Sequence, residues 1–243
     1  GITLEPSKDY LIESRLGALL RECGCADYTD LCRQARSDSS KKLEQKIVDR
    51  ITTGETLFFR DTSPFDLLRH KILPDLIDRR SSLLARPVSI RIWSAGCATG
   101  QEVYSIAIVL KELLASARGY NIRLLGTDIS DAAIALASYG RYNHLEIERG
   151  LPAEQRRKYF VEDGSTWKIQ DEIRAMVSFR KMNLMLPFVG LGKLDIVFCR
   201  NVSIYFSIED RKKLFEKIAS TMERDGYLIV GSTESLTGIC PRF

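Results

Sequence analysis

The chain has 243 residues, a length typical of one or two domains with a sizeable core. Lys and Arg number 36 against 32 Asp and Glu, and this net charge of +4 is too small for a dedicated nucleic-acid binder. No apolar run approaches the roughly 20 residues that cross a bilayer, and no signal peptide opens the chain. We therefore expect a cytoplasmic protein with no nucleic-acid partner and no membrane insertion.

Six cysteines are scattered along the sequence, a usage that suits a reducing cytoplasm better than a disulfide framework. Cys23, Cys25 and Cys32 lie close together, but no C-x-x-C pair occurs, and His70 and His144 are far away in sequence. We expect no metal site, because buried or idle thiols explain this pattern more simply.

The first stretch, residues 1–78, is predicted to be a helical domain. Apolar residues recur at helical spacing in three places, the last of them at 65–76. Ser63 is expected to cap this last helix, with Pro64 as its first residue. We expect residues 79–82 to form a linker.

Strands and helices alternate in the second region, residues 83–243. Gly140 is expected to end the second helix as a left-handed cap, and Asp225-Gly226 to form a turn. Strands are predicted at 88–93, 122–126, 194–198 and 227–230, and helices at 103–114, 131–138 and 214–222. This alternation predicts an α/β fold in which helices cover both faces of a parallel sheet.

One segment, about 141–181, breaks the alternation because it is polar and irregular. It has weak strand signals at 166–169 and 177–179. We interpret it as a small inserted subdomain.

A glycine loop follows the first predicted strand and leads into a helix. It contains Gly96 and Gly100 and is followed by Glu102, while Asp128 ends the second strand. The spacing is neither the dinucleotide G-x-G-x-x-G nor a P-loop, so a phosphate-rich ligand is disfavoured. S-adenosyl-L-methionine has no phosphate but carries a sulfonium cation and a ribose, and the two carboxylates favour it.

Both acids also have plainer explanations. Glu102 is equally well explained as a first-turn acid that complements the helix dipole. For Asp128 the plainer explanation is a cap for the helix after Ile129, although Ser130 is better placed for that role.

Six segments carry further motifs. They are 52–60 (TTGETLFFR), 93–102 (WSAGCATGQE), 126–129 (GTDI), 182–184 (MNL), 198–206 (FCRNVSIYF) and 231–236 (GSTESL). In this order, over nearly the whole chain, they resemble the CheR family of methyltransferases, which esterify glutamates on chemotaxis receptors. The first and fifth segments are specific to that family, whereas the glycine loop is common to many methyltransferases.

The resemblance implies an N-terminal all-helical domain beside a Rossmann-like methyltransferase domain, with a small β-subdomain inserted before the third parallel strand. It implies that Arg60 and Tyr205 lie nearest the transferred methyl group. The implied cofactor-binding residues are Gly54, Thr56, Arg60, Gly96, Glu102, Asp128, Asn183, Leu184, Arg200 and Asn201.

The sequence departs from the family pattern in three places. Gly54 stands where the family commonly has an asparagine that contacts the cofactor. The N-terminus starts without the opening helix of relatives, and Phe243 stops where further strands of the sheet would follow.

The implied reaction transfers the methyl group to a glutamate carboxylate and leaves S-adenosyl-L-homocysteine. Glutamate is already ionised at neutral pH, so the reaction needs no general base. Arg60 is expected to hold the carboxylate through its planar guanidinium, and the plainer alternative is an ion pair with a nearby acid such as Asp61. Tyr205 is expected to shape the methyl channel or donate a hydrogen bond, or else to be a core aromatic.

The implied partner is the cytoplasmic helical region of chemoreceptors. Basic residues of the second and third helical segments suit an acidic receptor surface, but a solvated helix face explains them more simply. They are Arg33, Arg36, Lys41, Lys42, Lys46 and Arg50. Residues 161–167 form a short, glycine-poor stretch compared with relatives that dock a receptor's C-terminal tether peptide, so we expect no tether binding.

Two alternatives remain open at this point. A methyltransferase acting on RNA or an amine is disfavoured, because residues 200–203 lack the [DNS]-P-P-[YF] turn of amino-methylating enzymes. A non-catalytic, cofactor-binding adaptor is favoured only by Gly54, which removes a ligand side chain.

Overall fold

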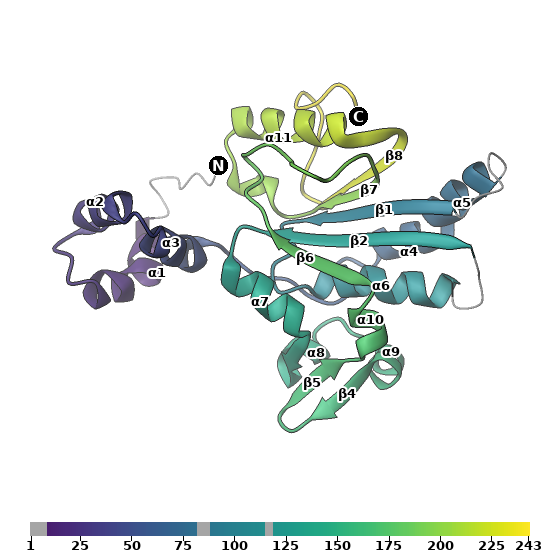
Figure 1. The fold of residues 1–243 in the computed structure, drawn as a ribbon, viewed down its shortest axis with the longest axis horizontal. Helices are drawn as coiled ribbons and strands as arrows, with labels where there is room; N and C mark the ends of the chain where they lie inside the picture. Colours follow the sequence, from purple (N-terminus) through teal and green to yellow (C-terminus); the bar gives the residue numbers. More distant parts are fainter. Residues whose placement is uncertain (1–8, 82–87, 115–118) are drawn as a thin grey trace.

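The centre of the molecule is a five-stranded parallel sheet (Figure 1), with the strand order β6-β2-β1-β7-β8. The structure is a computed structural model that describes residues 9–81, 88–114 and 119–243. The strands are β1 (Val88–Ala95), β2 (Tyr120–Asp128), β6 (Val177–Lys181), β7 (Leu194–Cys199) and β8 (Met222–Val230). Because β1 pairs with both β2 and β7, the strand order reverses at β1, and ligands bind beyond the carboxyl ends of such strands.

Helices cover both faces of the sheet, as the alternating pattern predicted (Figure 1). The two faces of β1 bury different side chains: Ile90 and Ile92 pack into one core, and Trp93 into the other. The first core includes α6 (Gln101–Leu114), and the second includes α11 (Ile208–Thr221). Full burial of each such side chain contributes about 1.5–3 kcal/mol to stability.

Three N-terminal helices form a separate unit with its own core, at one side of the molecule in Figure 1. They are α1 (Asp9–Glu22), α2 (Tyr28–Ser37) and α3 (Lys42–Ile51). Leu16, Leu19 and Leu31 are buried between them. The start of α2, which the sequence pattern did not separate from α1, is set by Asp27, whose side chain accepts from Asp30 N at 2.8 Å.

The helical residues after α3 pack on the sheet rather than on α1–α3. They form α4 (Ser63–Leu67), the π-helical turn η2 (Leu68–Ile72) and α5 (Leu73–Ser81). Phe65, Leu68 and Leu76 join the core that contains Ile90. This packing differs from the predicted division at residue 78, because helical periodicity shows that a face is buried but not which partner buries it.

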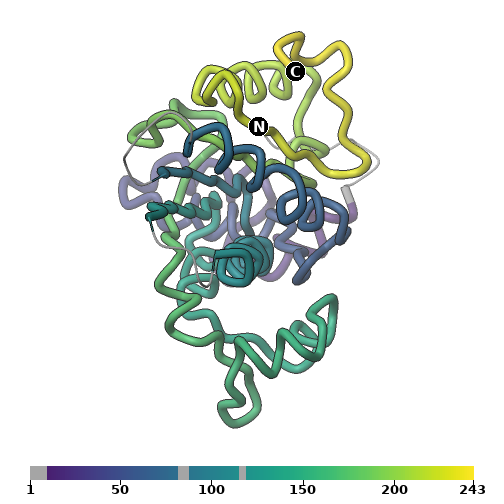
Figure 2. The backbone as a smooth tube through the Cα atoms, turned by 90° about the vertical axis from the view of Figure 1, so that its right-hand side faces the viewer, coloured from purple at the N-terminus to yellow at the C-terminus, as the bar shows by residue number. Residues whose placement is uncertain are grey.

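The inserted segment forms a three-stranded antiparallel sheet with the order β3-β5-β4. Its elements are β3 (Arg141–Asn143), α8 (His144–Glu148), α9 (Ala153–Tyr159), β4 (Phe160–Asp163), β5 (Thr166–Ile169) and α10 (Asp171–Arg174). It projects from the body of the molecule (Figure 2). We call this unit the β-subdomain.

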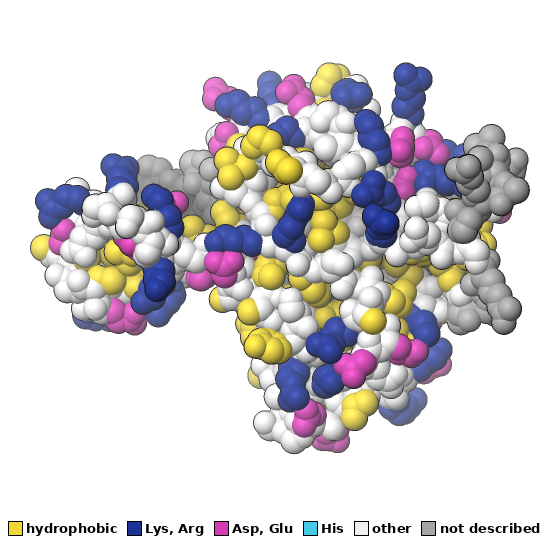
Figure 3. Space-filling view, viewed as in Figure 1, with side chains coloured by type: hydrophobic (Ala, Val, Ile, Leu, Met, Phe, Trp, Pro, Cys, Tyr) yellow, Lys and Arg dark blue, Asp and Glu magenta, His cyan; other side chains and the backbone are white. Residues whose placement is uncertain are grey.

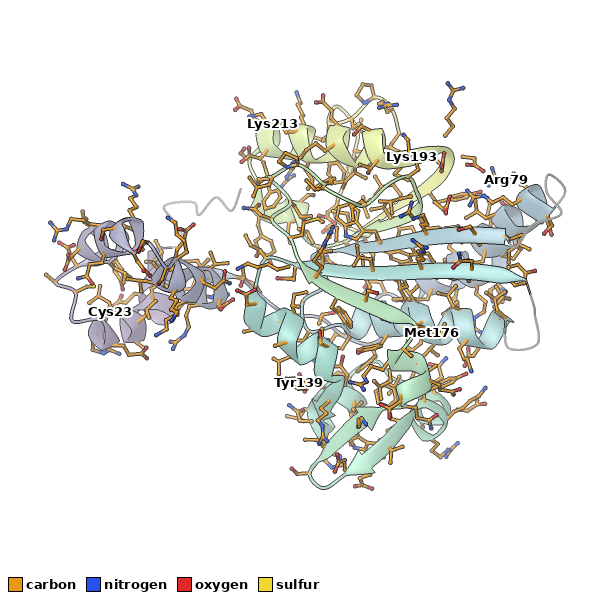
Figure 4. All side chains as sticks on the ribbon, in the orientation of Figure 1. Cys23, Arg79, Tyr139, Met176, Lys193 and Lys213 are labelled. Carbon is orange, nitrogen blue, oxygen red and sulfur yellow. The ribbon has the colours of Figure 1, made fainter. Side chains whose placement is uncertain are left out.

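The expected range of the insertion, 141–181, is too long at its end. Residues 177–181 form β6, which pairs in parallel with β2 in the main sheet. Met176 lies where the β-subdomain rejoins that sheet (Figure 4). The sequence of a short strand does not indicate which strand it pairs with, so the prediction placed residues 177–181 in the insertion rather than in the main sheet.

Several local predictions can be compared with the structure. Gly140 ends α7 (Asp131–Tyr139) with φ of 63°, and Ser130 caps its start, as predicted. Thr62, not Ser63, precedes α4, and no side chain caps that helix. The turn expected at Asp225-Gly226 is wrong, because both residues lie inside β8, near an irregularity in its pairing with β7.

The predicted linker, 79–82, is also wrong in its described part. Residues 79–81 are the last turn of α5, and Ser82 lies outside the described residues. In the described ranges, no helix combines the length and apolar character that a membrane span requires.

Candidate active site

A cavity of about 810 Å³ opens at the carboxyl ends of β1, β2, β6 and β7. Residues 52–56, which follow α3, and side chains of α1 and α3 form its other wall. All the site residues expected from the sequence line it: Gly54, Thr56, Arg60, Gly96, Glu102, Asp128, Asn183, Leu184, Arg200, Asn201 and Tyr205. The fold thus brings together residues from five of the six motif segments, and none of these residues belongs to 231–236.

The glycine loop is tied to the neighbouring strand at the floor of the cavity. Gly96 N and Cys97 N both donate to Thr127 O, at 2.8 and 2.9 Å. Gly96 has φ of 74°, and a Cβ there would lie 2.5 Å from Val202 Cγ2. Glycine is therefore required both by the backbone conformation and by the close approach of the next loop.

Asp128 connects the end of β2 to this loop. Its Oδ2 accepts from Ala98 N and its Oδ1 from Ser130 N, both at 2.9 Å. Burial raises the pKa of Asp128, while these backbone donors oppose the rise. Each carboxylate oxygen keeps acceptor capacity for a hydroxyl in the cavity. The alternative role as helix cap falls to Ser130, whose Oγ accepts from Ala133 N at 3.0 Å.

Glu102 belongs to a buried ionic network at the first turn of α6. Its Oε2 lies 2.9 Å from Arg200 Nη1, and its Oε1 accepts from Ser94 Oγ at 2.8 Å. Burial raises the pKa of Glu102, and the Arg200 guanidinium opposes this effect. Complementing the helix dipole is thus at most part of its role, because the side chain also pairs with Arg200 in the cavity wall.

Arg200 is 1% exposed at its side chain and joins three parts of the wall. Besides Glu102 it contacts Asp61 Oδ2 at 2.9 Å and Arg60 O at 2.8 Å. The ion pair between Arg60 and Asp61, offered as the plainer explanation of Arg60, is therefore not what the structure shows. Asp61 pairs with Arg200 instead.

The Arg60 guanidinium remains available at the cavity wall. Its Nη1 donates to Glu55 O at 3.3 Å, and within the described ranges no carboxylate forms an ion pair with it. Phe59 and Asp61, on either side, both have positive φ, 49° and 54°. This strained backbone is held by Arg200 and by Ser105 Oγ, which accepts from Phe59 N at 2.9 Å.

The loop after β6 brings Asn183 and Leu184 to the cavity. Asn183 Oδ1 accepts from Met185 N at 2.9 Å, which leaves its amide nitrogen without a partner among the described residues. Lys217 of α11 donates to Leu184 O at 2.5 Å. Burial lowers the pKa of this lysine. The sequence analysis did not identify Lys217, which has no motif around it.

The loop after β7 carries Asn201 and Tyr205. Asn201 has φ of 57°, and Tyr205 ends a 3₁₀ turn, η3 (Ser203–Tyr205). Tyr205 is 37% exposed, so it is not a core aromatic. The carboxylate of Glu234 holds this loop by accepting hydrogen bonds from Asn201 N and Ser203 N. Sequence reasoning missed Glu234 although it quoted the surrounding GSTESL motif.

The helical unit α1–α3 closes one side of the cavity. Leu11, Arg15 and Asp49 line it, and none of them was expected from the sequence. Lys181, at the end of β6, contacts Gln45 of α3 and lies 2.7 Å from Asp131 of α7. The contacts therefore join the helical unit to the sheet beside the cavity.

The donor set fits S-adenosylmethionine. Two carboxylates, those of Glu102 and Asp128, suit its cationic groups and ribose hydroxyls. The guanidinium of Arg15 is held by Ile51 O and Thr53 Oγ1, at 2.6 and 3.0 Å. The wall therefore has no cluster of free cations, in the described ranges, of the kind that a pyrophosphate needs. No group of three metal-ligating side chains lies together in those ranges either.

Comparison with known proteins agrees with this geometry. Residues 54–243 match the model of the CheR methyltransferase, SAM binding domain, and residues 1–52 match that of the CheR methyltransferase, all-alpha domain. The chain is 40% identical to a chemotaxis protein methyltransferase of Vibrio parahaemolyticus, covering 100% of this chain and 87% of the relative. It is 37% identical to that of Borreliella burgdorferi, covering 98% and 84%.

Among solved structures, the carbon methyltransferase DszA superposes with a TM-score of 0.40 and 15% identity, over 90% of this chain and 41% of that one. A likeness this low supports no argument. The two family matches, which together span nearly the whole chain, are decisive: it belongs to the CheR methyltransferase family and is an enzyme that uses S-adenosylmethionine.

Proposed function

We propose that this enzyme methylates glutamate side chains of chemotaxis receptors and thereby sets their sensory adaptation. The observation that carries the proposal is the Arg60 guanidinium, which lines the cavity and forms no ion pair with a described carboxylate. A planar guanidinium pairs with a carboxylate through two parallel hydrogen bonds, so Arg60 suits an incoming glutamate.

The chemistry requires little beyond positioning. S-adenosylmethionine supplies an electrophilic methyl group on a sulfonium. A carboxylate oxygen of the substrate forms a bond to the methyl carbon while the carbon–sulfur bond breaks, and the electron pair stays on sulfur. The products are a glutamyl methyl ester and S-adenosylhomocysteine. In-line placement of two reactants can lower a barrier by about 7–11 kcal/mol.

The residues divide this work between them. Arg60 holds the carboxylate, and Tyr205, with an exposed ring at the cavity, limits its approach to the methyl group. Asp128 and Glu102 hold the polar groups of the methyl donor, together with Asn183 and the loops that carry Gly54, Thr56, Leu184 and Asn201. No proton transfer is needed, because the substrate glutamate is ionised at neutral pH.

The helical unit supplies a docking surface for the acidic receptor. Basic and acidic side chains are interspersed on it (Figure 3). Arg33, Lys41 and Arg50 form ion pairs with acids of the unit, at 2.6, 3.2 and 3.4 Å. Exposed ion pairs are weak, so these residues can change partners on binding, and the effect falls mainly on the association rate.

The test combines the protein with methyl-labelled S-adenosylmethionine and receptor cytoplasmic fragments, followed by mild base. We expect label on the receptor that base releases as methanol, because methyl esters hydrolyse and methylamines do not. A receptor variant with glutamine at the labelled positions serves as the control and takes up no label. Cofactor binding without any label would contradict the proposal and favour an adaptor.

A further inference from the structure

Glu234 is a carboxylate outside the cavity wall that receives four hydrogen bonds. Its Oε2 accepts from Asn201 N at 2.7 Å and Gly231 N at 2.8 Å, and its Oε1 accepts from Ser203 N at 2.9 Å and Ser203 Oγ at 2.7 Å. No described cation forms an ion pair with it. All four donors are neutral, and three of them are backbone amides.

These donors connect two loops that are distant in sequence. Gly231 follows β8, whereas Asn201 and Ser203 follow β7 and lead to Tyr205. A Cβ at Gly231 would lie 2.7 Å from Glu234 Oε2 and 3.0 Å from Asn201 Nδ2. The carboxylate therefore sits in a space that only glycine leaves open.

The backbone that Glu234 holds is strained. Asn201 has φ of 57°, in the left-handed region that an asparagine adopts at a cost. Ser203, 2% exposed, begins the 3₁₀ turn that ends at Tyr205. On the other side of this turn, Arg211 donates to Ser203 O and Ile204 O at 2.7 and 3.3 Å. The turn is thus held on one side by Glu234, which accepts hydrogen bonds, and on the other by Arg211, which donates them.

We propose that Glu234 is a positioning residue of the methyltransferase, which holds Asn201 and Tyr205 in their working positions without touching either substrate. An ionised carboxylate is an acceptor at all its lone pairs, so it can satisfy four donors at once. A glutamine would turn an NH₂ group toward at least one backbone N–H and lose that hydrogen bond, even where the Ser203 hydroxyl turns to accept from it. The inference rests on the proposed role of Tyr205 in ester formation.

The test compares the wild type with Glu234→Gln. Hydrogen bonds to a charged group are worth about 1.5–3 kcal/mol, so we expect kcat for receptor methylation to fall roughly 10- to 100-fold. The KM for the receptor stays within about 2-fold, because Glu234 does not contact it. Amide hydrogen exchange in residues 200–206 rises, while exchange in the central strands does not. Glu216→Gln, an exposed acid on α11, serves as the matched control and changes nothing.

If Glu234→Gln fails to fold, Ser203→Ala removes one of the four bonds and is expected to show a smaller change in the same direction. Unchanged kcat or unchanged exchange in residues 200–206 overturns the inference. Failure of the wild type to form an ester would instead overturn the proposed function. In that case two other measurements on Glu234→Gln decide the role of Glu234. They are the amide hydrogen exchange of residues 200–206 and the affinity for S-adenosylhomocysteine, which we expect to fall because Asn201 is displaced.

Discussion

Arg200, which lines the cavity, and Asp61 form a 2.9 Å ion pair, so Asp61 is not paired with Arg60, its neighbour in the sequence. The two arginines therefore have different roles in our proposal, Arg200 a structural one and Arg60 a substrate-binding one. Arg200 is buried, and both terminal nitrogens of its guanidinium have protein partners: Nη1 contacts Glu102, and Nη2 contacts Asp61 and Arg60 O. Arg60 is half-buried and keeps its charge available to a substrate.

Arg60→Ala tests this difference in roles directly. Loss of a charge-assisted contact worth about 1.5–3 kcal/mol predicts a roughly 10- to 100-fold fall in kcat/KM for the receptor. Arg60→Lys restores charge but not the planar fork, and we expect it to recover only part of the loss. The measurement is initial-rate methylation over a series of receptor concentrations. Arg224→Ala, at an exposed arginine of β8, is the control, and equal rates for Arg60→Ala and Arg224→Ala would refute the role of Arg60.

Gly54→Asn introduces the side chain that the family commonly has at this position. A Cβ at Gly54 meets nothing within 4 Å, so the larger residue has room. One added hydrogen bond is worth about 0.5–1.5 kcal/mol, which predicts a roughly 2- to 10-fold tighter binding of S-adenosylhomocysteine. Isothermal titration calorimetry measures the change. Gly54→Ala adds bulk without a donor or acceptor and is expected to leave affinity unchanged; a weaker Gly54→Asn complex would contradict the prediction.

Gly96→Ala is expected to have the opposite effect. The new Cβ would lie 2.5 Å from Val202 Cγ2, and alanine at φ of 74° is strained as well. Such strain costs about 1–3 kcal/mol, so we expect affinity for S-adenosylhomocysteine to fall roughly 5- to 100-fold. Adding Val202→Ala removes the clash but not the strained φ, and the double variant should recover part of the affinity. Normal binding by Gly96→Ala alone would show that the loop relaxes freely.

The sequence was sufficient to predict four of the five strands of the main sheet, the glycine loop and part of the cavity lining. Apolar strands such as 194–198 are buried on both faces, so their apolar run is nearly continuous, with Asp195 as its one charged residue. Motif residues that follow strands meet at one edge of a parallel sheet by geometry alone. This is why Asp128 could be expected beside the glycine loop, whereas Arg200 was expected there only from the resemblance to the CheR family.

The features that could not be predicted are those that depend on which residues meet in the folded structure. The apolar face of 65–76 has the same period whether it packs on helices or on a sheet, and β6 is too short to indicate its neighbour. The pairing of Asp61 with Arg200 rather than Arg60 depends on side-chain directions set by positive φ at residues 59 and 61. No periodicity encodes such details.

Asp38 predicts a pH dependence of folding. Hydrogen bonds from Ser40 and from Leu43 N lower the pKa of Asp38 from 3.8 to about 2. Because the folded state favours the ionised form, this stabilisation is present above pH 3.8 and is lost as the pH falls toward 2. Asp38→Asn should therefore lower the urea midpoint at neutral pH and lose less stability than the wild type on acidification. Glu13→Gln, at an exposed acid of α1, should keep the wild-type profile; identical profiles for Asp38→Asn and the wild type would contradict the prediction.

The β-subdomain is expected not to bind a receptor's C-terminal tether peptide. Its strands β4 and β5 pair as far as Asp163 and Thr166, so Gly164 and Ser165 alone form the turn, with φ of 63° at Gly164. A turn this tight projects no loop past the edge strand that could hold an added peptide strand against it. Titration of the protein with a tether peptide should give no saturable binding, and removal of the tether from a receptor should change its methylation rate by less than about 2-fold. Saturable binding that a charge reversal in β4, Glu162→Lys, weakens would show that the edge of this small sheet is a docking site after all.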